Sequence, residues 1–459
     1  MAQSVSSGEG RGTSGFVYVV ATIAAIGGLL FGYDLGIISG AIIFINDVFS
    51  LSPFLKGLVV SSLLIGAVIG AGLSGNFADK LGRRTLTLIA AVIFVLGAIG
   101  MALSPTVGVL IFFRVFTGLG VGASSVLVTT YVAEIAPTEI RGSLTSLFQL
   151  AITLGILLAY LVNFALSGFE AWRWMLGLAA LPAIVLFVWM YFVPETPRWL
   201  IKHDFMDRAR NVLRRLHGQQ DVEQQIREIQ ETEQEEPEVG ARELLAPWVR
   251  PMFIVGIGLA VLQQLVGINT IIYYAPTIIK STGIGVSTSI LATVGIGVVN
   301  VLFTFVAIWL IDKLGRKKLL LYGLIGMTIG TAVLGWSFIQ SEISGAFAWL
   351  TLGSMLLYVA SFAASFGPVL WVMLPELFPL HIRGSAVGVS SLSNWAANFA
   401  IALLFPVLVA ALGQTSVFWG LGVICIISMV FIYFIVPETM GRSLEAIERD
   451  LRQGVRIRG

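Results

Sequence analysis

The sequence predicts an all-α integral membrane protein with twelve transmembrane helices, arranged as two six-helix bundles with a cytoplasmic helical linker between them. Three observations predict this fold class. Hydrophobic residues make up 57% of the 459 residues and charged residues 12%, which is too apolar a composition for a water-soluble chain of this length. Apolar windows long enough to cross a bilayer recur along the chain. Polar motifs of the first half return in the second half.

The twelve expected spans follow from windows of about 20 mostly apolar residues. They lie at 16–45, 57–78, 85–104, 107–132, 144–167, 173–193, 252–279, 286–311, 318–340, 346–374, 385–410 and 415–436. We therefore expect a tail at 1–15, a first bundle at 16–194, a linker at 195–250, a second bundle at 251–436 and a tail at 437–459. The linker is densely charged, with acid and base pairs at helical spacing, which indicates short helices. It is either a solvated connector or a clamp across the inner mouth.

The basic residues predict how the chain is oriented in the membrane. Of the 28 Lys and Arg residues, Lys56, Arg173 and Lys280 fall in or beside the odd-numbered connections, and Arg114 lies within a span. The remaining 24 lie at the termini and the even-numbered connections. Because cytoplasmic loops carry an excess of Lys and Arg, we expect a multi-pass protein of the cell membrane with both termini in the cytoplasm.

The two halves of the chain repeat each other. "DKLGRRT" at 79–85 returns as "DKLGRKK" at 312–318, "EIAPTEIRG" at 134–142 as "ELFPLHIRG" at 376–384, and "VPETPRWL" at 193–200 as "VPETMGRSL" at 436–444. Two equivalent bundles related by an axis along the membrane normal place a binding site at their interface near the middle of the bilayer, where rocking exposes it to each side in turn.

The motifs also carry a resemblance. The segments "PETPRWL", "QQLVGINTIIYYAP", "PELFPLHIRG" and "PETMGRSLEAIE" together resemble those of the sugar porters of the major facilitator superfamily, over essentially the whole chain. The resemblance implies the major facilitator fold and a secondary active transporter, not an enzyme. The three His residues lie in cytoplasmic segments without metal-ligand spacing, and a phosphate-binding loop of the Walker type is absent from the sequence. We expect no cofactor, no metal and no nucleic acid, and a transporter that functions as a monomer in the lipid bilayer.

A monosaccharide site needs side chains that both donate and accept hydrogen bonds, and aromatic rings that cover the faces of the sugar. The seventh span offers Gln263, Gln264 and Asn269, and Gly267 permits a break that aims these amides inward. Each amide could instead bond a neighbouring helix. The resemblance implies sugar contacts from several spans, by Gln149, Gln263, Gln264, Asn269, Asn300 and Asn394, with Phe31, Tyr273, Trp371 and Trp395 lining the pocket.

Asp34 is a carboxylate inside the first span, where a charge costs roughly 2.5 to 3.5 kcal/mol on insertion scales. Arg114, early in the fourth span, lies at a compatible depth. A carboxylate that gains and loses an arginine partner during a conformational cycle can bind and release a proton. The pair is either this proton switch or a permanent structural ion pair. The resemblance favours the switch, because similar proton symporters carry Asp at this position. Proton is then a co-substrate.

Acidic and basic residues gather at the expected inner ends of the spans. Glu134 and Arg141 recur as Glu376 and Arg383 at the same seven-residue spacing. Topology alone explains part of this charge. The resemblance implies a cytoplasmic gate of interlocking ion pairs, formed by Arg83, Arg84, Glu134, Arg141, Glu195, Arg316, Glu376, Arg383 and Glu438.

Three functions remain open at this point. The first is symport of a proton with a monosaccharide, a glucose-like hexose or a xylose-like pentose, by alternating access. The second is a facilitative sugar uniporter in which Asp34 is structural. The third, a non-transporting sugar sensor, is disfavoured because only about 22 residues follow the last span, whereas sensors of this kind append a long signalling tail.

Overall fold

The computed structural model describes residues 15–135, 141–217, 222–235, 246–339 and 345–440, and the described residues are helical almost throughout. The helices of the first half are α1 (Gly15–Phe49), α2 (Pro53–Leu81), α3 (Arg83–Ala102), α4 (Val107–Ile135), α5 (Arg141–Ser167), α6 (Trp172–Gly177) and α7 (Ala180–Phe192). The linker forms α8 (Pro197–Lys202), α9 (Met206–His217) and α10 (Val222–Glu235). The second half comprises α11 (Arg250–Leu265), α12 (Ile268–Lys280), α13 (Val286–Leu314), α14 (Arg316–Ser337), α15 (Gly345–Ala363), α16 (Phe366–Leu377) and α17 (Leu380–Ile435).

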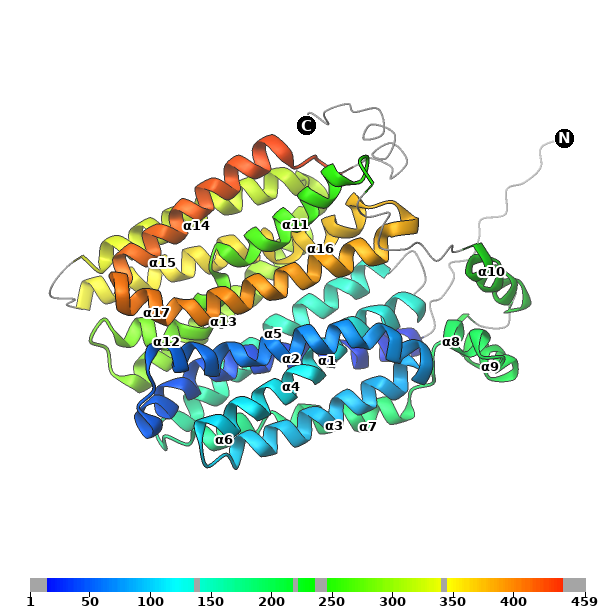
Figure 1. Ribbon diagram of the computed structural model, residues 1–459, viewed down its shortest axis with the longest axis horizontal. Helices are drawn as coiled ribbons and strands as arrows, with labels where there is room; N and C mark the ends of the chain where they lie inside the picture. Colours follow the sequence, from blue (N-terminus) through cyan, green and yellow to red (C-terminus); the bar gives the residue numbers. More distant parts are fainter. Residues whose placement is uncertain (1–14, 136–140, 218–221, 236–245, 340–344, 441–459) are drawn as a thin grey trace.

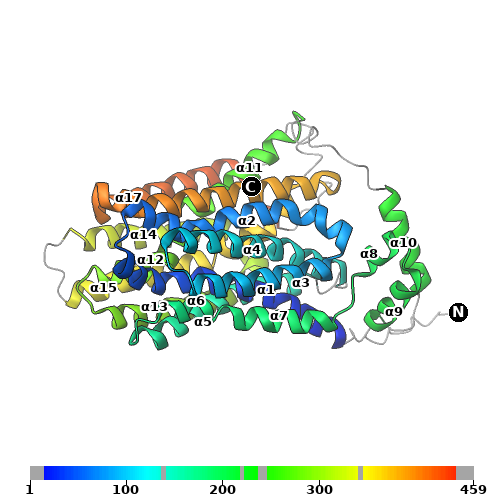
Figure 2. The same cartoon turned by 60° about the horizontal axis from the view of Figure 1, so that its bottom comes forward.

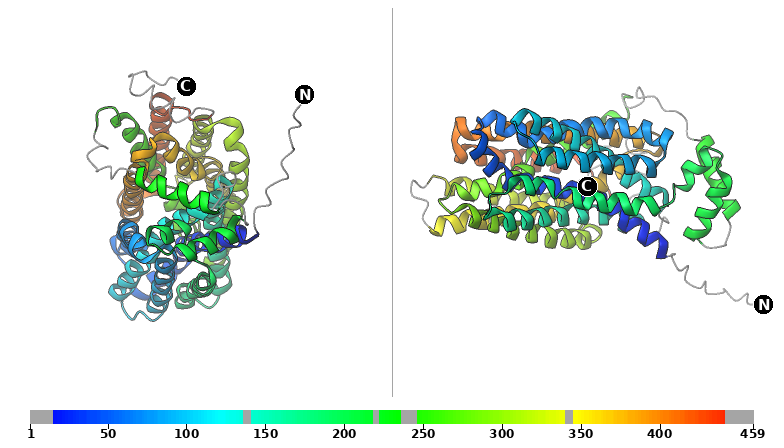
Figure 3. Two further views of the ribbon diagram at one scale, coloured as in Figure 1. Left: turned by 90° about the vertical axis from the view of Figure 1, so that its right-hand side faces the viewer. Right: turned by 90° about the horizontal axis from the view of Figure 1, so that it is seen from below.

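The long helices lie roughly parallel in one elongated bundle (Figure 2), and Figure 1 shows the first-half helices on one side and the second-half helices on the other. Helices α8 to α10 lie beyond one end of the bundle (Figure 3). We call this the linker end. The opposite end, where α1 connects to α2 and α12 connects to α13, is called the far end. The most extensive contacts between the halves are those of α2 with α17, of α5 with α13 and of α1 with α12.

The membrane-spanning pattern agrees with the predicted fold class. The described residues contain 11 helical stretches that are long and apolar enough to cross a bilayer. One of them, Ile382–Ile435, has 54 residues, about twice what a span requires. Gly413 divides it, because its backbone is not helical there, with φ 79° and ψ 160°. The two predicted spans at 385–410 and 415–436 are therefore two helices that meet at a kink at Gly413.

Two further spans are broken near the middle of the bundle. In the seventh span Gly267 adopts a left-handed conformation, φ 96°, between α11 and α12, which confirms the predicted break. Glycine pays no steric penalty in this region. The tenth span breaks as well, between α15 and α16, where Ser365 has φ −133° and ψ −91°. The sequence reasoning missed this second break because its apolar pattern continues through it.

The two halves touch directly at two places away from the linker end. A Cβ atom added to Gly57 of α2 would collide with the backbone of Leu403 in α17, so the two helices touch there through a glycine. Gly297 of α13 packs against Leu157 and Tyr160 of α5 in the same manner. Gly57 is in the first turns of α2, at the far end, and the other residues lie at mid-depth or nearer the far end by their positions along α5, α13 and α17. The far end is thus closed by direct helix contact between the halves.

Candidate functional site

A cluster of buried carboxamides lies where α11, α12 and α17 meet. Asn269 donates through Nδ2 to Oε1 of Gln264 at 2.7 Å, and Gln264 donates through Nε2 to Oδ1 of Asn394 at 3.1 Å. Asn394 in turn donates to Oε1 of Gln263 and to the carbonyl of Ala260, both at 2.8 Å. The structure therefore brings together four amides that the sequence proposed for sugar binding, and all four are buried.

The break at Gly267 is what places Asn269 in this cluster. On one continuous helix, residues 264 and 269 lie about 140° apart around the axis, given about 100° per residue. The left-handed residue between them turns α12 relative to α11, and Asn269 then reaches Gln264. Gln263 is held separately, because its Nε2 donates to the carbonyl of Phe366 at 2.7 Å. This carbonyl stands at the first residue of α16, so both broken spans contribute to the cluster.

Aromatic rings connect the amide cluster to the first half. Trp395, next to Asn394, lies 5.3 Å from Phe31 of α1 between ring centroids, so two of the residues proposed to line the pocket touch across the interface. Tyr273 of α12 is buried, and its hydroxyl accepts a hydrogen bond from Nδ2 of Asn398 at 3.4 Å. The structure places these rings between the amides of the second half and helix α1 of the first.

Two of the amides proposed to contact sugar are not hydrogen-bonded in the described structure. Within that part of the chain, the side chains of Gln149 and Asn300 form no hydrogen bond. Gln149 lies 11 residues before Tyr160 on α5, which is three turns and nearly the same face, and Asn300 lies one turn from Gly297 on α13. Both therefore belong to the facing surfaces of α5 and α13, on the linker-end side of the closed contact. Trp371 of α16 is 39% exposed.

Asp34 and Arg114 are paired as expected, but loosely. Nη1 of Arg114 lies 3.9 Å from Oδ1 of Asp34, and both side chains are 1% exposed. Neither carboxylate oxygen of Asp34 has a hydrogen-bond partner among the described residues, and the same is true of Nε and Nη1 of Arg114. Nη2 of Arg114 donates to the carbonyl of Val60 at 3.1 Å. A buried carboxylate without hydrogen bonds is costly, so this pair is poorly stabilised as an ion pair.

The loose pair lies close to the groups proposed to bind sugar. Phe31, which touches Trp395, is one turn before Asp34 on α1. Tyr273 and Tyr274 of α12 lie near Arg114, as does Asp34. A movement of α12 relative to the first half therefore changes the surroundings of Arg114 and the position of Tyr273 at the same time.

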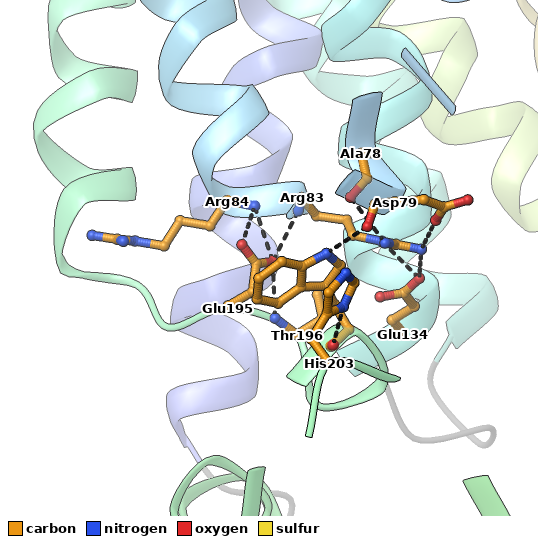
Figure 4. A network of polar contacts seen from close by, with 9 residues as sticks. Ala78, Asp79, Arg83, Arg84, Glu134, Glu195, Thr196 and His203 are labelled. Carbon is orange, nitrogen blue, oxygen red and sulfur yellow. Dashed lines mark hydrogen bonds and ion pairs between the residues drawn. The ribbon is translucent and has the colours of Figure 1, made fainter. Parts of the chain in front are cut away.

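The charged residues at the linker end of the first half form one network (Figure 4). Arg83 contacts Glu134 through Nη2 at 3.0 Å and Asp79 at the same distance, and it donates to the carbonyl of Ala78. The carboxylate of Glu195 accepts hydrogen bonds from the backbone N–H groups of Arg83 and Arg84 at the start of α3. Burial raises the pKa of Glu195, and its hydrogen bonds with the backbone oppose that rise.

The second half repeats the main contacts of this network. Arg316 contacts Glu376 at 3.0 Å and Asp312 at 3.3 Å. Glu438 accepts hydrogen bonds from the backbone N–H groups of Arg316 at 2.9 Å and Lys317 at 3.0 Å, at the start of α14. The free N–H groups at a helix start favour a negative charge. The repeated "DKLGR" and "VPET" motifs therefore bind each other within each half.

This arrangement differs from the predicted gate in several members. Glu195 and Glu438 hold helix starts through backbone N–H groups instead of joining arginine ion pairs. The guanidinium of Arg84 donates to the carbonyls of Met190 and Tyr191, and Arg383 donates to the carbonyl of Phe378 at 3.2 Å. The side chain of Arg141 lies outside the described residues. The ion pairs that are seen, Arg83 with Glu134 and Arg316 with Glu376, each stay within one half.

The sequence reasoning missed Thr439 as a member of the network. Its hydroxyl donates to Oε2 of Glu376 at 2.6 Å. The signal was available, because a threonine follows the glutamate in both "VPET" motifs. Tyr160, which contacts the second half, was also missed, since a tyrosine in an apolar span carries no motif of its own.

The broken helices, the buried amides at the interface and the bundle architecture define a polytopic membrane transporter. The family model described as sugar (and other) transporter matches residues 20–451. The chain belongs to the sugar porter family of the major facilitator superfamily, and it is a transporter, not an enzyme.

Individual relatives cover nearly the whole chain. The D-xylose transporter of Levilactobacillus brevis is 46% identical over 96% of this chain and 96% of its own length. The arabinose-proton symporter of Bacillus subtilis is 41% identical over 95% of both chains. Among solved structures, the partially occluded inward open conformation of the xylose transporter XylE from E. coli has a TM-score of 0.83 at 34% identity, and the match covers 94% of this chain and 100% of that one.

Proposed function

We propose that this protein is a proton symporter for a monosaccharide, a glucose-like hexose or a xylose-like pentose, and that it works as a monomer by alternating access. Residues 16–194 and 251–436 act as two bundles that rock about the substrate. Both termini and the linker lie in the cytoplasm, so the linker end is the inner end and the far end faces outside. In this assignment the structure represents a state closed to the outside.

The observation that carries the proposal is the state of Asp34. Its carboxylate is buried, lies 3.9 Å from the nearest arginine nitrogen and has no hydrogen-bond partner in the described structure. A permanent structural ion pair needs good geometry and satisfied hydrogen bonds to offset desolvation, and this pair lacks both. A carboxyl group in such surroundings favours protonation when Arg114 moves away and ionisation when it returns.

The amide cluster supports a sugar as the other substrate. Gln263, Gln264, Asn269 and Asn394 bond mainly to one another, and amides that bond to each other can exchange those bonds for sugar hydroxyls at small cost. Asn300 and Gln149 supply further amides, while Phe31, Tyr273, Trp371 and Trp395 cover the ring. The relatives include an arabinose-proton symporter, and a pentose and a proton are the substrates that its name states.

Helices α1 and α12 couple sugar binding to the protonation of Asp34. Phe31 and Asp34 are one turn apart on α1, and Tyr273 lies on α12 within electrostatic range of Arg114. Sugar bound against Phe31 and Tyr273 therefore fixes the helices that set the distance between Asp34 and Arg114. One proton that moves down 100 mV releases about 2.3 kcal/mol, which supports roughly 50-fold accumulation of a neutral sugar.

The test compares Asp34→Asn with Asp47→Asn in proteoliposomes. Asp47 is an exposed carboxylate near the far end of the same helix, so it is a matched control for the loss of one charge. We expect Asp34→Asn to abolish uptake against a sugar gradient while it still exchanges labelled sugar between equilibrated pools. Asp47→Asn should keep both activities. Concentrative uptake by Asp34→Asn at the wild-type level would refute proton coupling through this residue.

A further inference from the structure

Buried tyrosine hydroxyls in this protein donate to backbone carbonyls that have lost a helical partner. Tyr358 donates to the carbonyl of Val266, directly before the break at Gly267, at 2.7 Å. Tyr274 donates to the carbonyl of Ala402 at 3.0 Å. Ala402 lies four residues before Pro406, and proline has no N–H to donate to the carbonyl four residues earlier. In each case the hydroxyl satisfies a carbonyl that would otherwise be buried and unpaired.

Tyr160 does the same, but from the other half of the molecule. Its hydroxyl donates to the carbonyl of Ile272 at 2.9 Å. Ile272 lies four residues before Pro276, which is inside α12, so this carbonyl also lacks the helical donor that it would have in an unbroken helix. Tyr160 belongs to α5 of the first half and Ile272 to α12 of the second. The contact therefore exists only while the two halves are together at this depth.

The ring of Tyr160 occupies a slot that fits it closely. A Cβ atom added to Gly297 of α13 would lie 3.0 Å from the ring of Tyr160 and 3.1 Å from the side chain of Leu157. Tyr160 is completely buried. The side chain thus enters the second half between α12 and α13, with glycine on one side and the proline-exposed carbonyl at its tip.

We propose that Tyr160 is a latch residue, which holds the far end closed by satisfying the Ile272 carbonyl that Pro276 leaves unpaired. When the far end opens, α5 and α12 separate, and both the hydroxyl and the carbonyl lose their partner. Without the hydroxyl, the Ile272 carbonyl would be buried and unpaired in the closed state and hydrated in the open state, which would favour opening. The hydrogen bond of Tyr160 removes this penalty, so the latch favours the closed far end. Tyr160 acts on the transport cycle as a positioning residue, with no contact to the substrates.

The inference rests on the alternating-access part of the proposed function and does not depend on proton coupling. The measurement is the distance across the far end. Spin labels are attached to cysteines that replace Phe54 of α2 and Leu412 of α17, both exposed, one in each half. The single native cysteine, Cys425, is replaced by alanine. Double electron–electron resonance in nanodiscs without sugar then gives the ratio of the open to the closed far end.

We expect Tyr160→Phe to raise this ratio about tenfold, since the ring stays and only the hydroxyl is lost. The matched control is Tyr358→Phe, which removes a hydroxyl of the same kind within the second half, and it should leave the ratio unchanged. Pro276→Ala supplies an N–H for the Ile272 carbonyl. In that background Tyr160→Phe should change the ratio less than twofold.

Two results would overturn the latch. One is an open-to-closed ratio of Tyr160→Phe within twofold of the parent. The other is a change of equal size in Tyr358→Phe, which would show a general loss of packing. Acid-driven sugar uptake by the wild-type protein is measured separately, so failure of the latch and failure of proton coupling are distinguishable.

Discussion

The hydroxyl of Thr439 donates to Oε2 of Glu376 at 2.6 Å, yet the corresponding pair of the first half is not bonded. The Thr196 hydroxyl and Oε2 of Glu134 are both buried, and neither has a partner in the described structure. The two networks are otherwise closely matched, down to the carboxylate at each helix start. The two halves therefore differ in this hydrogen bond at the linker end.

Thr439→Val should destabilise the protein, and Thr196→Val should not. The first change removes a hydrogen bond to a carboxylate, which is worth about 1.5 to 3 kcal/mol. The second replaces a hydroxyl without a partner by a methyl group of similar size. Thermal unfolding of the purified variants in detergent measures the difference. Equal losses in both variants would mean that the two sites are equivalent in solution.

Gly82→Ala should be destabilising by about 1 to 3 kcal/mol. Gly82 has φ 91° and ψ 153°, a conformation that residues with a Cβ avoid, and its added Cβ would collide with the Glu195 carboxylate. Gly75→Ala, seven residues earlier in α2, is the control, because Gly75 has open space around it. The midpoint of thermal unfolding should fall for Gly82→Ala and hold or rise for Gly75→Ala. A fall of the same size in both would contradict the strain argument.

Gly57→Leu should keep the far end open. The Leu403 backbone leaves no room for a side chain at Gly57, and overpacking of this kind costs about 1 to 3 kcal/mol. Sugar exchange should fall roughly tenfold, while sugar binding from outside survives. Gly72→Leu, at an exposed glycine of the same helix without neighbours within 4 Å, should exchange sugar normally. Normal exchange by Gly57→Leu would place the closed contact elsewhere.

Asn394→Ala should weaken both sugar binding and thermal stability, whereas Asn300→Ala should weaken sugar binding alone. Asn394 bonds to Ala260, Gln263 and Gln264, so its loss should lower the unfolding midpoint and raise the KM for sugar about tenfold. Asn300 forms no side-chain hydrogen bond in the described structure. Its loss should raise the KM without a change in the unfolding midpoint. An unchanged KM in Asn300→Ala would remove it from the proposed sugar contacts.

Much of the fold follows from the sequence because apolar length and charge position are strong signals. The break at Gly267 was predictable, since a glycine stands between amides that cannot share one helical face. The break at Ser365 was not, because serine in an apolar run carries no such signal. The pairing of Asp34 with Arg114 followed from depth, whereas its 3.9 Å separation depends on how α1 and α4 pack.

The partners of the glutamates in the linker-end network could not be predicted from the sequence. The repeated motifs identified Glu195 and Glu438, but the resemblance to the sugar porters placed them among the ion pairs of a gate. In the structure they bind backbone N–H groups at helix starts, and backbone groups do not appear in a motif. The role of Tyr160 could not be predicted for a similar reason. Pro276 lacks an N–H, which predicts an unpaired carbonyl at Ile272, but only the packed structure shows which hydroxyl donates to that carbonyl.

The central claim is that a proton enters with each sugar through Asp34, and the most direct measurement is the pH outside vesicles that contain the purified protein. Addition of a transported monosaccharide to weakly buffered, de-energised proteoliposomes should make the medium alkaline, and Asp34→Asn should abolish the change. Sugar entry without any change in external pH in the wild-type protein would contradict symport and leave facilitative uniport as the function.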